Sequence, residues 1–139
     1  IVESGVKILS NQVQYSILDD RPENGMAEFC QKHSIKLLCY GTVAGGFLTD
    51  RYLNASEPEE PLENRSLTKY KLIIDECGGW DMFQHILHTL EIIARNKQVS
   101  IANIATRYIL EKSQVTGIII GARSTNHLSD LLKIFNFFS

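Results

Sequence analysis

Three stretches of this sequence pass from an apolar run into polar side chains that could hold a ligand. The first contains Gln12, whose amide can donate and accept hydrogen bonds together, as a ligand carboxamide requires. The alternative is a strand glutamine that satisfies neighbouring backbone groups, which is the commoner situation for side-chain amides. Residue type alone leaves both interpretations open.

The second stretch joins Tyr40 to a segment that contains Gly41, Gly45 and Gly46. The tyrosine ring could stack on a planar heterocycle such as nicotinamide, although a core tyrosine with a bonded hydroxyl is as common. Glycines let a backbone approach a ligand closely, but they are weak evidence by themselves. This stretch indicates a ligand only in combination with the others.

The third stretch places Gly121, Arg123 and Ser124 between a strongly apolar run and an expected helix. Backbone N–H groups at a helix start, a guanidinium and a hydroxyl suit an anion, of which phosphate is the commonest in cells. A capped helix with a solvated arginine explains the same residues. If an anion binds, it could also belong to a phosphorylated small molecule rather than a dinucleotide.

Histidine and cysteine spacing predicts no metal site. Three histidines fall on expected helices without a partner at metal-ligand spacing: His33, His85 and His88. The cysteines are odd in number and lack a CxxC pattern, so all are expected to be free: Cys30, Cys39 and Cys77.

The spacing of apolar residues predicts the strands and helices that position these three stretches. Short apolar runs alternate with longer amphipathic segments, which is typical of successive βα units around a parallel sheet. Residues 49–66 hold two prolines and an acidic cluster, which predicts a surface loop within one domain of residues 1–139. Strands are expected over 6–13, 35–40 and 115–120, and helices over 23–33, 67–77, 80–97, 101–112 and 125–135.

Two of the expected helices show a clear apolar face. The helix over 80–97 has a stripe at three- and four-residue steps, formed by Phe83, Ile86, Leu87, Leu90, Ile93 and Ala94. The next helix follows Ser100 as its predicted N-cap. Its expected inner face is Ile101, Ile104, Ala105, Tyr108 and Ile109.

Three βα units make up roughly half of a (β/α)8 barrel, because a complete barrel takes about 250 residues and this chain has 139. Such barrels bind ligands at the carboxyl ends of their strands, where all three stretches fall. The chain begins with Ile1 in a domain-like stretch, so an upstream segment is expected. Open edges of a parallel sheet would also require a complement.

Composition narrows the class of protein. With 44% hydrophobic and 22% charged residues, the chain is expected to form a globular unit. A net charge of -2 without a basic patch argues against nucleic acid. No apolar run approaches the roughly 20 residues that cross a bilayer and no secretory signal is visible, so a cytoplasmic protein without a membrane partner is expected.

The three stretches in this order resemble a known family. SNQVQYSILDDRP resembles the sixth strand of aldo-keto reductases, LLCYGTVAGGFLTDRYL resembles the seventh with its loop, and IIIGARSTNHL resembles the eighth with its cofactor-clamping turn. SIANIATRYILEKSQVTGIIIGAR also follows the helix and strand of that family. The resemblance covers nearly the whole chain and implies an α/β fold, the C-terminal half of a (β/α)8 barrel with strands six to eight.

The resemblance also implies an NADPH site. Gln12 matches the glutamine that holds the nicotinamide carboxamide, and Tyr40 matches the tyrosine that stacks on the nicotinamide ring. Arg123 and Ser124 match the pair that grips the phosphate on the adenosine ribose, which implies NADPH over NADH. The other implied cofactor positions are Gly41, Val43 and Gly45 along the pyrophosphate, Gly121 before the clamping turn, His127 beside the adenine, and Asp130.

Some positions depart from the family pattern. Gly41-Thr42-Val43 replaces the usual Ser-Pro-Leu, which removes a hydroxyl contact to phosphate, and Leu131 stands where an asparagine commonly bonds the adenine. The catalytic Asp, Tyr, Lys and His of the family belong to earlier strands, and none of them maps here. No catalytic residue is therefore expected in this chain.

Two functions remain open at this point. The resemblance implies part of an oxidoreductase that reduces small aldehydes or ketones with NADPH, completed by a missing N-terminal half or a complementary chain. The alternative is a catalytically inactive half barrel that binds a nucleotide or a protein partner through its open sheet edge.

Overall fold

A three-stranded parallel sheet forms the centre of the computed structural model, which describes residues 1–121 and 125–137. Its strands lie in the order β1 (Ser10–Gln14), β2 (Lys36–Tyr40) and β3 (Val115–Ile119). Ser10 pairs with Lys36 and Gln14 with Tyr40, so the first two strands end together. The parallel strands alternate with helices, which confirms the predicted α/β fold of a partial barrel.

Two helices cover one face of the sheet and leave the other face open. Leu37 and Cys39 of β2 are fully buried against α1 (Met26–Lys32) and α4 (Ile101–Leu110). Because side chains alternate along a strand, the neighbouring residues point to the opposite face. On that face Tyr40 keeps 37% of its surface exposed and Ile119 keeps 41%. Among the described strands, β1 and β3 each pair only with β2, so both outer edges are open.

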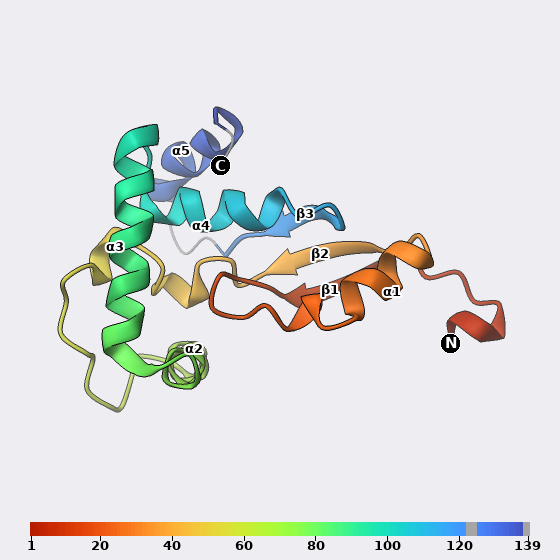
Figure 1. Ribbon diagram of the computed structural model, residues 1–139, viewed down its shortest axis with the longest axis horizontal. Coiled ribbons are helices and arrows are strands. Elements are labelled where there is room, and N and C mark those ends of the chain that lie inside the picture. Colours follow the sequence, from red (N-terminus) through yellow and green to blue (C-terminus); the bar gives the residue numbers. More distant parts are fainter. Residues whose placement is uncertain (122–124, 138–139) are drawn as a thin grey trace.

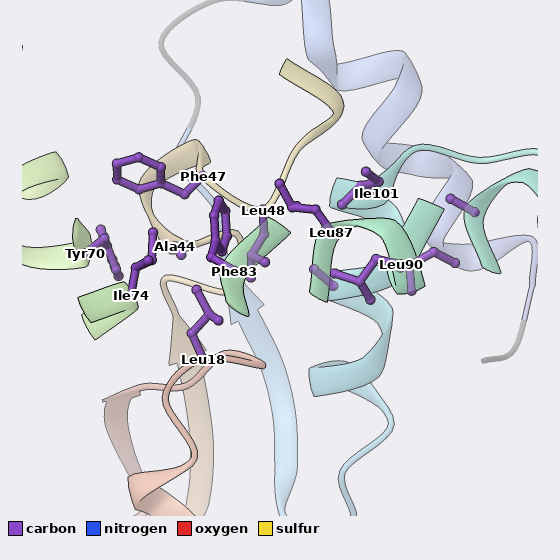
Figure 2. Close-up of a cluster of buried hydrophobic side chains, with 13 residues drawn as sticks. Leu18, Ala44, Phe47, Leu48, Tyr70, Ile74, Phe83, Leu87, Leu90 and Ile101 are labelled. Carbon is purple, nitrogen blue, oxygen red and sulfur yellow. The ribbon is translucent and has the colours of Figure 1, made fainter. Parts of the chain in front are cut away.

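A second core lies beyond the carboxyl ends of the strands. There α2 (Arg65–Glu76) and α3 (Gly79–Lys97) stand on the side toward which the strand arrows point (Figure 1). Figure 2 shows the apolar side chains that join these helices to the loop after β2 and to α4. The fully buried members include Phe47, Leu48, Ile74, Leu87 and Ile101. This core fixes α2 and α3 over the strand ends, where a ligand site was expected.

Helix caps set several boundaries. The side chain of Ser100 accepts a hydrogen bond from the backbone N–H of Asn103, which confirms the predicted N-cap of α4. Asn64 caps α2 in the same way through the N–H of Leu67, so that helix begins at Arg65, two residues earlier than predicted. Short 3-10 helices complete the elements: Val2–Ser4, Arg21–Glu23, Ala44–Gly46, Asp50–Tyr52, Thr125–His127 and Leu132–Phe135.

The first strand and the last helix differ from the prediction. The apolar run from residue 6 was expected to start β1, but pairing begins only at Ser10 because β2 starts at its partner Lys36. Val6 and Leu9 therefore lie exposed. The helix expected over 125–135 is broken, and α5 spans only Leu128–Leu131 between two 3-10 helices.

Two residues that were predicted to lie on buried helix faces are exposed in the structure. Ile93 is 36% exposed because the buried stripe of α3 is narrower than predicted and follows Phe83, Leu87, Leu90 and Ala94. Tyr108 is 44% exposed because its hydroxyl lies beside the ammonium of Lys112 at the margin of α4 rather than beneath it.

Candidate functional site

The open face of the sheet brings Gln12 and Tyr40 to neighbouring strands. Gln12 is opposite Leu38, and Tyr40 is one same-face step further along β2, opposite Gln14. Such diagonal neighbours lie about 7–8 Å apart, within reach of long and aromatic side chains. Gln12 is exposed and Tyr40 partly so. An amide in the middle of β1 and a flat ring at the end of β2 therefore share one accessible surface.

Gln14 lies on the same face and links that surface to a buried carboxylate. Its amide nitrogen donates to Asp19 Oδ2 at 2.6 Å. Arg21 donates to both oxygens of Asp19, at 2.6 and 2.7 Å. Burial opposes ionisation of Asp19, which is 4% exposed, but the hydrogen bonds from Arg21 and Gln14 outweigh burial and lower the pKa of that carboxyl. The carboxylate is a fixed anchor for the orientation of Gln14.

The segment after β2 turns sharply at its glycines. Gly41 has a φ of 74° and Gly45 a φ of 67°, in the left-handed region that favours glycine. The carbonyl oxygen of Gly41 accepts from the N–H of Ala44 at 2.9 Å, which closes the turn. Within residues 1–121 and 125–137, no hydrogen bond uses the N–H groups of Gly41, Thr42 or Val43. Free donors of this kind are suited to an anion.

Helix α2 places two side chains over this turn. The hydroxyl of Tyr70 lies where a side chain of Gly41 would begin, 2.3 Å from the ideal Cβ position. The Tyr70 ring also packs on Gly45, whose Cβ would lie 2.6 Å from a ring carbon. The ammonium of Lys69 donates to Gln14 Oε1 at 2.5 Å and lies 5.7 Å from the centroid of the Tyr40 ring. The two glycines thus make room for a tyrosine as well as for a close backbone approach.

The segment after β3 is described only in part. Gly121 and His127 are exposed, whereas Arg123 and Ser124, the predicted phosphate grip, lie outside the described residues. Asp130 has structural partners: one carboxylate oxygen accepts from Ser100 Oγ at 2.8 Å and from Asn103 Nδ2 at 2.9 Å. The carboxylate therefore ties α5 to the start of α4, and its assignment to cofactor binding remains a prediction.

A second polar cluster lies on the helix-covered side of the sheet, where Tyr15 packs with Leu37 and Cys39. Glu23 accepts from the hydroxyl of Tyr15 and from the ammonium of Lys112, the latter at 2.7 Å. These residues line a shallow cavity of about 320 Å³. Burial and the hydrogen bond to Glu23 raise the pKa of Tyr15. Because its polar groups satisfy one another, this cluster joins the 3-10 helix Arg21–Glu23 to the loop before β3 rather than offering free binding groups.

Other kinds of site find little support. The described residues contain no group of three metal-ligating side chains. Cys30 and Cys39 are buried and Cys77 is exposed, and all three are free as predicted. Burial raises the pKa of the Cys39 thiol to about 11, so it is not a nucleophile at neutral pH. None of the described helices combines the length and the apolar composition needed to span a bilayer.

Three parallel strands that alternate with helices match part of a (β/α)8 barrel, a fold that binds ligands at the carboxyl ends of its strands. The model of the aldo/keto reductase family matches residues 2–139, and the chain belongs to this family. Its described residues have the fold of a partial barrel.

Two relatives show what the chain is similar to in sequence. The chain is 29% identical over 113 residues to flagellar radial spoke protein 5 of Chlamydomonas reinhardtii, covering 79% of this chain and 21% of that protein. It is 23% identical over 132 residues to an L-glyceraldehyde 3-phosphate reductase of Escherichia coli O157:H7, covering 94% and 38%. The chain thus spans well under half the length of these relatives.

Solved structures match the fold over similar shares. A glycerol dehydrogenase from Gluconobacter oxydans aligns with a TM-score of 0.81 at 17% identity, over 99% of this chain and 40% of that one, and supports the fold alone. The holo form of an aldo-keto reductase from Bacillus halodurans aligns with a TM-score of 0.60 at 27% identity, over 94% and 36%.

Sequence patterns did not identify Gln14, Lys69 or Tyr70 as part of this region. The period of two along β1 could have found Gln14, because residues 12 and 14 face the same way. No local pattern links Lys69 and Tyr70 to the turn at Gly41, because they lie far from Gly41 along the chain.

Proposed function

We propose that this chain is the cofactor-binding half of an NADPH-dependent enzyme that reduces aldehydes or ketones to alcohols. The observation that carries the proposal is the shared accessible surface of Gln12 and Tyr40, next to a turn whose N–H groups have no acceptor among the described residues. An amide, a flat ring and anion-binding donors correspond to a carboxamide, a heterocycle and a phosphate. A dinucleotide with a nicotinamide ring contains all three, so the residues present fit it.

Each residue then has a distinct task. Gln12 holds the carboxamide and thereby sets the orientation of the ring, and Tyr40 supports one face of that ring. Gly41, Val43 and Gly45 lie along the pyrophosphate. Bound NADPH supplies the hydride that reduces the carbonyl carbon. At the far end the adenosine phosphate lies against Arg123 and Ser124, with Gly121, His127 and Asp130 around the adenosine.

The proton for the carbonyl oxygen comes from outside this chain in our proposal. Strands that complete the barrel along the open edges of β1 and β3 would carry the catalytic group and the carbonyl pocket. The same open edges support the alternative of a non-catalytic interaction module, because unpaired edges recruit other strands. Consumption of NADPH with a carbonyl substrate by the full-length protein decides between the two.

Cofactor binding tests the assignment directly. Tyr40→Leu in the full-length protein removes the flat support of the ring, and stacking of this kind is worth roughly 1–3 kcal/mol. We expect NADPH to bind at least about fivefold more weakly in a fluorescence titration. Tyr108→Leu is the matched control, since that tyrosine is similarly exposed on α4. Equal affinities for Tyr40→Leu and the control would contradict the stacking role.

The preference for NADPH has its own test. Arg123→Ala should weaken NADPH more than NADH in the same titration, because only NADPH carries the extra phosphate for the guanidinium. Equal losses for the two cofactors would remove Arg123 from that role and leave the rest of the site standing.

A further inference from the structure

The ammonium of Lys69 is held beside the ring of Tyr40 at the accessible surface. It lies 5.7 Å from the centroid of the Tyr40 ring and 4.5 Å from the centroid of the Tyr70 ring. It also donates to Gln14 Oε1 at 2.5 Å. Cations are attracted to aromatic faces within about 6 Å of the ring centroid. Contacts from β1, β2 and α2 therefore define where this positive charge lies, although the lysine itself is exposed.

Packing on one side and hydrogen bonds on the other keep the ammonium in place. Tyr70, the next residue of α2, is 5% exposed, and with Ile74 it belongs to the core beyond the strand ends (Figure 2). On the sheet side, the amide nitrogen of Gln14 donates to Asp19 while its oxygen accepts from Lys69. The amide cannot turn over without losing two hydrogen bonds to charged groups, which are the stronger kind. The fold thus sets the position of the charge.

No carboxylate of the described residues neutralises this ammonium. The partners of Lys69 in that part of the chain are an amide and two aromatic rings. The nearby carboxylate of Asp19 is already paired with Arg21, which donates to both of its oxygens. Lys69 therefore adds one positive charge to the surface that Gln12 and Tyr40 share.

We propose that Lys69 makes this surface discriminate the oxidation state of a nicotinamide, so that the reduced form binds in preference to the oxidised form. The inference rests on the proposed function, in which the nicotinamide lies on Tyr40. The oxidised ring carries a positive charge, whereas the reduced ring is neutral. A fixed ammonium repels the charged ring and not the neutral one, and the sign of this effect is the same whichever face of Tyr40 the ring takes.

The tyrosine alone would give the opposite preference. Because the face of an aromatic ring attracts cations, Tyr40 without Lys69 would favour the oxidised nicotinamide. Lys69 already places a cation on this ring. Two positive charges that share one ring lie within a Debye length, which is about 10 Å at 0.1 M salt, so salt does not remove their repulsion. The ratio of the dissociation constants for NADP⁺ and NADPH therefore reports on Lys69, since stacking on Tyr40 is common to both.

Titration calorimetry of the full-length protein with each cofactor at 0.1 M salt measures this ratio. Lys69→Met keeps the apolar stem without the charge, and we expect it to lower the ratio of Kd for NADP⁺ to Kd for NADPH about fivefold. Lys69→Arg keeps a charge and should keep the wild-type ratio. Lys7→Met, which removes an exposed ammonium before β1, should also keep it. An unchanged ratio in Lys69→Met, or an equal fall in either control, overturns the proposal.

The two proposals fail in different ways. If neither cofactor binds to the wild type, the proposed function fails and the role of Lys69 fails with it. If both cofactors bind and Tyr40→Leu weakens them, but Lys69→Met has the wild-type ratio, the cofactor site stands and only the role of Lys69 fails. Partial unfolding of a variant weakens both cofactors alike and leaves the ratio unchanged, so it cannot imitate the expected result.

Discussion

The contact between Gly41 and Tyr70 gives a stability prediction that the structure defines closely. A Cβ at position 41 would lie 2.3 Å from the Tyr70 hydroxyl oxygen and 3.2 Å from the ring carbon that carries it. An alanine also has to adopt the φ of 74° found at Gly41, in the left-handed region. Gly41→Ala therefore combines backbone strain with overpacking of a buried side chain.

The magnitude follows from these two costs. The left-handed conformation costs an alanine about 1–2 kcal/mol, and overpacking a well-packed region costs typically about 1–3 kcal/mol. We expect Gly41→Ala to lower the free energy of unfolding by roughly 2–5 kcal/mol in urea titrations of the protein. Gly79→Ala is the control, since Gly79 has a φ of 82° with no atom within 4 Å of its Cβ position. It should lose only the backbone part.

A double-mutant cycle isolates the overlap. In the Tyr70→Phe background the 2.3 Å contact disappears and the 3.2 Å contact with the ring carbon remains. Gly41→Ala should then cost about 1–2 kcal/mol less than in the wild type, because residues in direct contact couple by this amount. Equal losses in both backgrounds would show that the glycine is needed for its backbone conformation alone, and would refute the steric argument.

Two further predictions concern acid and thiol chemistry. The hydrogen bonds to Asp19 lower its pKa below the value of 3.8 expected for the unfolded chain, so they stabilise the fold fully above pH 3.8 and less as pH falls through the folded pKa. Asp19→Asn should therefore lower the free energy of unfolding in urea at pH 7, and the difference from the wild type should shrink below pH 4. A difference that stays constant down to pH 3 would contradict this assignment. Iodoacetamide should label the exposed Cys77 in the native protein before the buried Cys30 and Cys39, and mass spectrometry that finds Cys39 labelled first would contradict the burial of that thiol.

The sequence predicted correctly those helices and strands whose limits depend on residues close together in the chain. The apolar run from Ile35 to Tyr40 became β2 almost unchanged, and the Ser100 cap was correct because capping depends on residues three positions apart. The start of β1 was wrong because pairing depends on where β2 begins, which the apolar run at residues 6–9 cannot encode. Exposure of Tyr108 likewise depends on what packs beside α4.

The residues of the candidate site likewise include some that the sequence could predict and some that it could not. The position of Tyr40 could be predicted because the apolar run from residue 35 ends where β2 stops, whereas Gln12 lies in the middle of β1 rather than at its end. Lys69 and Tyr70 could not be predicted, because they reach the turn through tertiary packing of α2. Gly41 is an example: the sequence predicted a close approach of backbone to a ligand, and the structure places a tyrosine hydroxyl where the side chain of another residue would begin.

The outer edges of β1 and β3, which pair with no other described strand, have a practical consequence for producing this polypeptide. Each margin offers a row of amide and carbonyl groups at the spacing of a neighbouring strand, next to apolar side chains such as Ile119. Residues 1–139 produced in isolation would tend to self-associate through these rows and be poorly soluble. A test of this expectation is size-exclusion chromatography of residues 1–139 at several protein concentrations, in which self-association would appear as a concentration-dependent shift to earlier elution.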